Sequence, residues 1–359
     1  MIIKNAKLEK SVADIKIENG VITGIGDFTG DEEIDAAGRK VIPGLIDIHV
    51  HGFGGYDTSD IGRLGDISVK LAEAGTTSWL PTTMTDSIEN LIKVTNQPLA
   101  PDGANIIGFH LEGPYISKKR KGAQNEKYIK NPDTEEFRKL KNVNIVTVAP
   151  ELCGAEKFIK NCNAVVSIGH TDCDYSTAVK AIEAGAMCLT HTFDAMPPML
   201  HREPGPIGAA FEKGIYAEVI CDGRHVSKTV FLALYKMFTS DRLILISDAI
   251  RPAGLEDGKY SSGGLDVHMN GGVLTLKDGT LAGGSGSLLD GVKKAVSFGV
   301  DFYEAVKMAS QTPADLLKLN KGRIEKGYDA DLVILNDDLN VRDVIVGGKV
   351  FKSKILRNV

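Results

Sequence analysis

The chain has 359 residues, 43% hydrophobic and 25% charged, a globular balance that excludes a disordered or collagen-like chain. Its 42 Lys and Arg against 47 Asp and Glu give a net charge of −5, which argues against a nucleic-acid-binding protein. No stretch approaches the roughly 18 apolar residues of a membrane span, and residues 1–10 lack a signal-peptide core, so we expect a cytoplasmic protein with no membrane partner.

The chain begins and ends with patterns typical of strands, and its middle alternates between strand and helix patterns. Residues 1–42 hold short alternating runs and a hairpin signal at Asn19-Gly20. Helical spacing then follows most of the apolar runs of the middle, for example at 66–74, 135–140, 175–184 and 227–238, and strand-like runs return over 331–335, 341–346 and 350–351. The eight candidate strands of the middle are 44–51, 76–82, 105–112, 144–149, 164–170, 186–191, 215–221 and 243–248.

Eight successive strand-then-helix units predict an α/β fold. A (β/α)8 TIM-like barrel takes ~250 residues, which residues 43–320 supply, and a doubly wound open sheet is the competing architecture. Neither end of the chain has enough strands for a stable core of its own. We therefore expect residues 1–42 and 321–359 to pack together as one small, discontinuous β-sandwich domain beside the barrel.

Two histidines follow each other at the end of the first barrel strand. Because side chains alternate along a strand, Asp47, His49 and His51 share one face. Two imidazoles on one face can hold a single metal ion, whereas the structural alternative is a pair of hydrogen-bonded polar residues at a strand exit. Histidines at the ends of other strands favour the metal.

Further histidines and acids do close other strands. His170 shares the face of Val166 and Ile168, and His191 shares that of Met187 and Leu189, so we expect both imidazoles to point into the barrel. Barrel active sites are assembled at this end of the strands. The residues gathered there are His49, His51, His110, Glu112, His170, His191 and Asp248.

These side chains offer nitrogen and oxygen ligands. The five cysteines are scattered without C-x-x-C spacing, so we expect core thiols, no disulfide framework and no thiolate ligands. These ligand types suit Zn²⁺ or Fe²⁺. If one coordination position is open, a water molecule can bind there, and the metal would lower the pKa of that water towards ~7. Asp248 can then act as the acid–base residue. The predicted reaction is metal-assisted hydrolysis of an amide, imine or ester.

Three further segments bear on the substrate. Arg202 can clamp a phosphate or carboxylate, or form a surface salt bridge. His225 follows the seventh strand, where it can polarise a carbonyl or cap a helix. The glycine-rich residues 281–287 can cradle an anion at a helix start, or Ser285 or Ser287 can cap that helix.

Together these segments resemble the amidohydrolase superfamily and, within it, the family of N-acetylglucosamine-6-phosphate deacetylases. H-x-H at 49–51, the two later histidines and the final aspartate are the general marks. The deacetylase marks are HLEGP (110–114), DAMP (194–197), HREPG (201–205) and DGRH (222–225), and a tail at 322–335 is typical of a return to the small β domain. The resemblance covers nearly the whole chain.

The resemblance implies the residues of a metal centre. Glu112, His170 and His191 would bind the catalytic divalent metal, and Asp248 would be the acid–base residue. Some relatives lose the H-x-H pair and keep one metal, so the retained His49 and His51 imply a second ion bridged by Glu112. The activity implied is hydrolysis of the acetamide of N-acetylglucosamine 6-phosphate.

The resemblance also implies a sugar site. His225 would polarise the acetyl carbonyl, and Arg202 would grip the 6-phosphate from the neighbouring subunit of a homodimer. Many relatives carry His at the position of Gln124 and Asn at that of Asp194, so a sugar contact is weakened and a negative charge added. The residues completing the sugar site would be Gln124, Asp194, Ala195 and Leu281.

Two other functions remain open at this stage. A cyclic-amide hydrolase of the dihydroorotase or hydantoinase type would use a carboxylated lysine as bridging ligand, where this chain offers Glu112. A non-catalytic scaffold would be expected to have lost some of its metal ligands or its acid–base residue. Here all six positions hold residues that can do this chemistry, namely His49, His51, Glu112, His170, His191 and Asp248.

Overall fold

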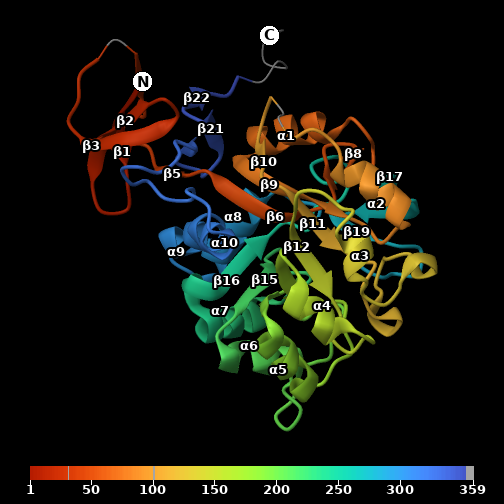
Figure 1. The fold of residues 1–359 in the computed structure, drawn as a ribbon. Helices are drawn as coiled ribbons and strands as arrows, with labels where there is room; N and C mark the ends of the chain where they lie inside the picture. The colour runs from red at the N-terminus through yellow and green to blue at the C-terminus, as the bar shows by residue number, and fades with distance from the viewer. Residues whose placement is uncertain (31, 100–101, 353–359) are drawn as a thin grey trace.

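Eight parallel strands form a nearly closed barrel in the computed structural model, which describes residues 1–30, 32–99 and 102–352 (Figure 1). All eight predicted strand positions are confirmed, and the order of strands around the barrel follows the chain. The strands are β6 (Leu45–Val50), β9 (Thr76–Thr83), β11 (Phe109–Glu112), β12 (Val143–Val148), β13 (Val165–Ile168), β14 (Ala186–Leu189), β15 (Tyr216–Ile220) and β16 (Leu243–Ile246).

The barrel closes between its first and last strands, at the end that carries the histidines. The N–H of Asp248 donates to the carbonyl of His49 at 3.0 Å, and the N–H of His51 donates to that of Ala249 at 2.8 Å. β10 (Asn105–Ile106) also pairs with β9, so the predicted strand 105–112 is one strand position broken in two. The doubly wound open sheet is thereby excluded.

Helices cover the outside of the barrel, and apolar strand residues pack against them. One helix follows each barrel strand, and two more connect the barrel to the last sheet. They are α1 (Leu64–Glu73), α2 (Ile88–Thr95), α3 (Thr134–Phe137), α4 (Ala155–Asn161), α5 (Tyr175–Ala184), α6 (Gly205–Lys213), α7 (Lys228–Arg242), α8 (Leu288–Phe298), α9 (Phe302–Met308) and α10 (Gln311–Leu317).

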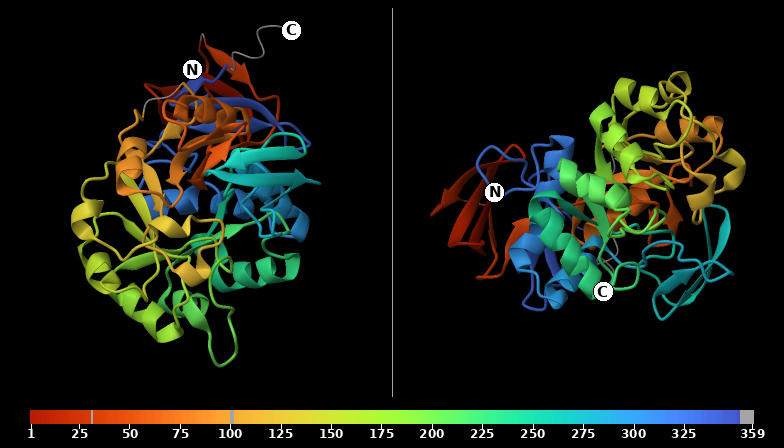
Figure 2. Two further views of the ribbon diagram at one scale, coloured as in Figure 1. Left: turned by 90° about the vertical axis from the view of Figure 1, so that its right-hand side faces the viewer. Right: turned by 90° about the horizontal axis from the view of Figure 1, so that it is seen from below.

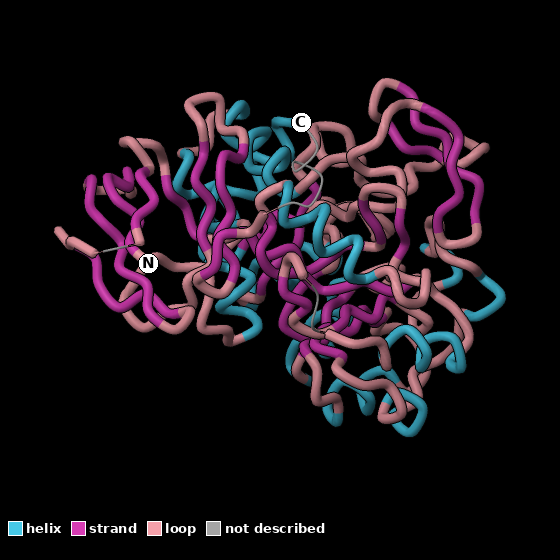
Figure 3. Tube along the Cα trace, turned by 90° about the horizontal axis from the view of Figure 1, so that it is seen from above, coloured by secondary structure: helices cyan, strands magenta, loops and turns pink. Residues whose placement is uncertain are grey.

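Both ends of the chain build a small β domain on one side of the barrel (Figures 1 and 3). One sheet holds β1 (Ile2–Lys7), β2 (Val12–Glu18), β3 (Val21–Gly26) and β4 (Glu33–Asp35), and the other holds β5 (Val41–Pro43), β20 (Leu332–Leu335), β21 (Val341–Val346) and β22 (Lys349–Val350). The predicted hairpin is confirmed, since Asn19 and Gly20 have φ of 52° and 79° as a type I′ turn requires.

The second of these sheets packs on both faces, which joins the small domain to the barrel. Leu332 and Ile334 lie in an apolar cluster with Ile3 and Ile15 of the first sheet. Their neighbours in β20 face the other way, and Val333 belongs to the large cluster that includes helices of the barrel. The expected sandwich of both chain ends is confirmed, and the residue boundaries of the two domains stay predictions.

An antiparallel insertion between β16 and α8 was not predicted. It holds β17 (Gly258–Ser262), β18 (Leu265–Asn270) and β19 (Val273–Thr275). Figure 2 shows it in teal, on the opposite side of the barrel from the red strands of the small domain. Its two hairpin turns are the pairs 263–264 and 271–272, four glycines with positive φ. These Gly-Gly pairs are the sequence signal that would have revealed it.

The cysteines form no disulfide, as predicted, because all five are free thiols. The expectation that they are core residues is wrong for Cys153, which is exposed, and Cys162 is only partly buried. Within the described residues, no helix has both the length and the apolar character required to cross a membrane.

Candidate active site

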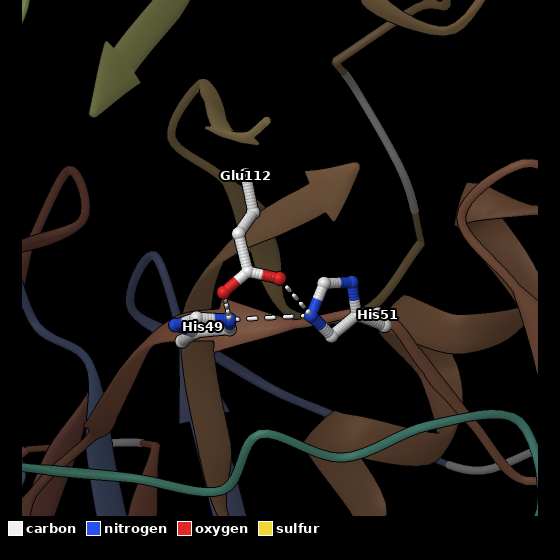
Figure 4. A group of neighbouring side chains, drawn as sticks. All are labelled: His49, His51 and Glu112. Carbon is white, nitrogen blue, oxygen red and sulfur yellow. Dashed lines mark hydrogen bonds and ion pairs between the residues drawn. The ribbon is translucent and has the colours of Figure 1, made fainter. Parts of the chain in front are cut away.

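Four imidazoles meet at one glutamate inside the mouth of the barrel. The Nε2 atoms of His170 and His191 lie 3.2 and 3.0 Å from Oε1 of Glu112. Figure 4 shows the same carboxylate over the first-strand pair, with Nε2 of His49 3.3 Å from Oε1 and Nε2 of His51 3.2 Å from Oε2. Glu112 thus faces two histidine pairs, which are contributed by three different strands and the loops that follow them.

Three residues of the site lie two positions beyond a strand end, in an unusual backbone conformation. His170, His191 and Asp248 follow β13, β14 and β16 and have φ of 44°, 27° and 47°. Positive φ is uncommon outside glycine and costs of order 1–3 kcal/mol where the surroundings impose it. The turn at each strand end therefore aims its side chain inwards.

This turn overturns the expectation that His170 shares a face with Val166 and Ile168. Both of those residues pack in the apolar cluster that includes α5. Ser167 points the other way, into the barrel, where its Oγ accepts a hydrogen bond from Thr190 at 2.7 Å. By simple alternation His170 would point outwards with Val166 and Ile168. Its positive φ interrupts the alternation, so its side chain points into the barrel instead. The same correction applies to His191 with Met187 and Leu189, because Met187 is exposed and Leu189 lies in that outer cluster.

Backbone carbonyls determine which nitrogen of each imidazole faces the centre. Nδ1 of His170 lies 2.8 Å from the carbonyl of Arg120, and Nδ1 of His191 lies 3.2 Å from that of Asp194. A carbonyl only accepts, so each Nδ1 carries a hydrogen, and Nε2 is the ring nitrogen that faces Glu112 and could bind a metal. These two Nε2 atoms are 3.0 Å apart.

Two imidazole nitrogens and one carboxylate oxygen gather around a single point, an arrangement that a divalent cation fits. Nitrogen ligands bind zinc at about 2.0–2.1 Å, which places tetrahedral ligand atoms about 3.3 Å apart. The separations around Oε1 of Glu112, 3.0–3.2 Å, match that spacing. The residues present therefore fit a divalent metal with two imidazoles and one carboxylate.

The electrostatics of the centre are those of a cation site. Burial raises and the charge of His170 lowers the pKa of Glu112, which ends well below its ordinary value. Burial alone would lower the pKa values of His51 and His191, but the neighbouring carboxylates outweigh it and raise each to about 9. The pKa of Asp248 is lowered, because His49 and His51 outweigh its burial. The acids are thus ionised at neutral pH.

His110 lies beside the centre without contributing to it. Its Nδ1 contacts the carbonyl of Ile48 at 3.0 Å, and its Nε2 contacts Oγ1 of Thr147 at 2.8 Å. Burial and the nearby His49 hold its pKa well below the ordinary value, so the ring is neutral. It is a hydrogen-bonded core residue.

Glu218 was not identified from the sequence, and it forms hydrogen bonds with two histidines of the centre. This fully buried carboxylate accepts from Nδ1 of His49 at 3.1 Å and from the N–H of His191 at 3.3 Å. It thereby orients Nε2 of His49 towards Glu112. The available signal was a charged residue within the apolar strand 216–220.

Comparison with known proteins decides the family. A model of the amidohydrolase family matches residues 40–351. N-acetylglucosamine-6-phosphate deacetylase of Bacillus subtilis is 38% identical, over 90% of this chain and 88% of its own. The crystal structure of the Thermotoga maritima deacetylase matches at a TM-score of 0.89 and 32% identity, over 99% of this chain and 100% of that one. The chain belongs to the N-acetylglucosamine-6-phosphate deacetylases of the amidohydrolase family.

A further deacetylase of the family has a ligand in its structure. It is a mutant of the enzyme from Mycobacterium smegmatis, in complex with N-acetyl-D-glucosamine-6-phosphate. This structure matches at a TM-score of 0.88 and 29% identity, over 98% of this chain and 99% of that one.

A cavity of about 390 Å³ opens over the metal centre of this deacetylase. Most of the residues that the sequence assigned to the sugar site line it, namely Gln124, Asp194, Ala195, His225 and Leu281. Arg202 is exposed and does not line the cavity of its own chain. Its guanidinium contacts Nε2 of His201 at 2.6 Å, and no carboxylate among the described residues forms a salt bridge with it. The anion clamp stays a prediction.

Gln124 contacts the metal centre rather than standing apart from it. The Thr85 N–H donates to its Oε1 at 2.6 Å, which directs its Nε2 to Oε2 of Glu112 at 2.5 Å. No sequence pattern predicted this bond, because residues 112 and 124 are joined by a loop without a regular repeat.

Two other residues that line the cavity, His225 and Asp194, have raised pKa values. Burial lowers but Asp222 raises the pKa of His225, whose Nδ1 lies 2.7 Å from that carboxylate, and the net shift is upwards. Burial raises the pKa of Asp194 to about 6. Asp222 also accepts the N–H of His225, so this histidine is held by its neighbour and caps no helix.

Of the alternatives for 281–287, Ser287 is the helix cap, accepting from Asp290 N–H at 3.3 Å.

Proposed function

We propose that this chain hydrolyses the acetamide of N-acetylglucosamine 6-phosphate to glucosamine 6-phosphate and acetate, in amino-sugar catabolism or recycling. The observation that carries the proposal is the convergence of His170, His191 and Glu112 under a cavity, in a chain of the deacetylase family. The ligand in the mycobacterial relative supports the choice of substrate.

The metal is proposed to be Zn²⁺ or Fe²⁺, because the donors are imidazole nitrogens and carboxylate oxygens. Glu112, His170 and His191 would hold the first ion, and His49 and His51 would hold a second that shares Glu112. A bound divalent ion would act as a Lewis acid on the acetyl carbonyl and make water a stronger acid.

Asp248 is the proposed acid–base residue. Its Oδ1 lies 3.4 Å from Nε2 of both His49 and His51, at the edge of the centre, and its carboxylate lines the cavity. Its lowered pKa keeps it ionised, so it can take a proton from water as the water oxygen attacks the acetyl carbon. It then returns that proton to the nitrogen as the C–N bond breaks and acetate forms.

His225 is proposed to stabilise the oxygen of the acetyl group as negative charge develops there. Because Nδ1 is held by Asp222, Nε2 is the ring nitrogen that can serve the cavity. Its raised pKa favours the protonated ring, whose Nε2–H is a charged donor.

Gln124, Asp194, Ala195 and Leu281 are proposed to position the sugar, since all four line the cavity. Arg202 is proposed to bind the 6-phosphate of a substrate molecule held in the cavity of the neighbouring subunit of a homodimer. Its exposed guanidinium would be available to that second chain. The cytoplasmic location is likewise a proposal, testable by cell fractionation.

The test is acetate release by the purified protein from N-acetylglucosamine 6-phosphate and unphosphorylated N-acetylglucosamine, with hydrolysis of dihydroorotate measured alongside. Fastest turnover of the sugar phosphate is expected. Preference for dihydroorotate would favour a cyclic-amide hydrolase, and no hydrolysis together with no bound divalent metal would favour a scaffold. Equal turnover of both sugars would contradict phosphate recognition.

A further inference from the structure

A second cavity lies between β9 and α2, apart from the one over the metal centre. Its volume is about 300 Å³, at the lower end of the range of small-molecule sites, about 300–1,000 Å³. The turn η2 (Glu126–Tyr128) and the glycine turn 263–264 of the antiparallel insertion complete its walls (Figure 1). None of the described residues that line it belongs to the metal centre.

The charges around this second cavity favour an uncharged ligand. Among the described lining residues, Asp86 is the only charged one, and there is no Lys, Arg or His. The Asp86 carboxylate is already paired. It accepts from Nδ2 of Asn90 at 3.1 and 3.2 Å and from the N–H of Ser87 at 2.6 Å. An anion therefore finds no cation in the lining, and a cation finds no unpaired carboxylate.

The Thr83 hydroxyl is a buried polar group that a ligand in this cavity can satisfy. Trp79 of the same strand faces the helices, because its Nε1 donates to Oγ of Ser68 in α1 at 2.9 Å. Thr83, four residues further on, shares that face and lines the cavity. Its side chain is 3% exposed, and its Oγ1 has no hydrogen-bond partner among the described residues. A buried hydroxyl without a partner is unfavourable, so a ligand that bonds to it gains affinity.

The rest of the lining offers further hydroxyls beside an apolar strip. Oγ1 of Thr58 donates to the carbonyl of Thr82 at 2.7 Å, and Oγ of Ser59 donates to Asp57 at 2.7 Å, so both oxygens can still accept from a ligand. The apolar lining comes from Met84, Leu91 and Val94, with the ring of Tyr128. Hydroxyls next to an apolar strip suit a sugar ring, which presents O–H groups at its edge and C–H groups on its faces.

Only a short loop separates this cavity from the active site. Met84 lines both cavities. The next residue, Thr85, donates its N–H to Oε1 of Gln124 at 2.6 Å, and Nε2 of Gln124 contacts Oε2 of Glu112 at 2.5 Å. A ligand in the second cavity would therefore contact the loop that orients Gln124 at the metal centre.

We propose that the cavity between β9, α2 and the insertion is a second binding site, for an uncharged hydroxylated molecule the size of one sugar ring. The Thr83 hydroxyl would bond to the ligand, and the apolar strip would cover one face of its ring. This inference goes beyond the proposed function and does not depend on it. The alternative is a cavity that holds water alone.

The test is an NMR titration of the metal-loaded protein with D-glucose, comparing Thr83→Val with Thr76→Val. Valine keeps the shape of the side chain and removes a hydroxyl that has no partner, so the fold should persist, as circular dichroism can verify. Thr76 is the matched control, because it lies in the same strand, is fully buried with Oγ1 likewise unpartnered among the described residues, and does not line the cavity. We expect the dissociation constant for glucose to rise about three- to tenfold in Thr83→Val, from the loss of one hydrogen bond, and to stay unchanged in Thr76→Val.

Glucosamine 6-phosphate distinguishes this site from the active-site cavity. An excess of it should leave glucose binding unchanged, whereas displacement of glucose would place that sugar in the active site and overturn the inference. Equal affinity of the two variants, or no saturable binding of glucose at millimolar concentrations, would also overturn it. The comparison of the variants requires no acetate release, so it decides the inference whether or not the proposed function holds.

Discussion

Replacement of Glu218 by Gln should weaken metal binding without changing the fold. The carboxylate has no exposed surface and accepts two hydrogen bonds, from Nδ1 of His49 at 3.1 Å and from the N–H of His191 at 3.3 Å. Gln keeps the volume and one acceptor but removes the charge that fixes the tautomer of His49. Partners of metal-binding histidines typically contribute about 10–100-fold in affinity, about 1.4–2.7 kcal/mol.

We expect roughly a tenfold rise in the metal dissociation constant for Glu218→Gln and up to about a hundredfold rise for Glu218→Ala. The assay is titration against a chromophoric chelator, with circular dichroism to verify folding. Glu183→Gln is the control, because Glu183 is exposed and pairs with Lys213 far from the centre. Unchanged affinity in a folded Glu218→Ala protein would refute the claim that this carboxylate orients His49.

Three other outcomes follow from the site and the fold. Asp248→Asn should lower kcat by about 10²–10⁴-fold and leave metal content unchanged, and near-normal turnover would contradict proton transfer by Asp248. Because Asp222 raises the pKa of His225 against the effect of burial, activity that needs the protonated ring falls as pH rises through that pKa. Asp222→Asn should therefore move the alkaline limb of kcat/KM to lower pH, and an unmoved limb would exclude this role of His225. Leu332→Ala, in the core shared by both sheets of the small domain, should lower the free energy of unfolding by about 2–5 kcal/mol in a denaturant titration, and a loss below about 0.5 kcal/mol would contradict that packing.

The barrel could be predicted because each strand is a short apolar run followed by a helical pattern. The strand Leu45–Val50 is buried along its whole length, as a barrel strand covered by helices must be. The insertion at 258–275 was missed because its strands are short and partly exposed and no helical pattern separates them. The signals present are the alternation of apolar and polar residues over Leu265–Asn270 and the two Gly-Gly turns.

The site could be predicted in its residue types but not in its geometry. Histidines and acids at strand ends indicated a shared centre. Alternation nevertheless grouped His170 with the wrong face of its strand, because a period-two pattern assumes extended backbone and does not predict a residue with positive φ. Glu218 and Gln124 reach the centre through contacts across the barrel, between residues far apart or in a loop. Such pairings depend on the closed barrel, which a single strand pattern does not encode.

The most direct measurement is acetate release from N-acetylglucosamine 6-phosphate by one protein preparation in three states: as purified, after chelation, and after restoration of Zn²⁺ or Fe²⁺. Activity should disappear with the metal and return with it, in proportion to the ion content measured by mass spectrometry. Deacetylation that persists in metal-free protein, or that never appears in the metal-loaded protein, would contradict a metal-dependent deacetylase centred on Glu112.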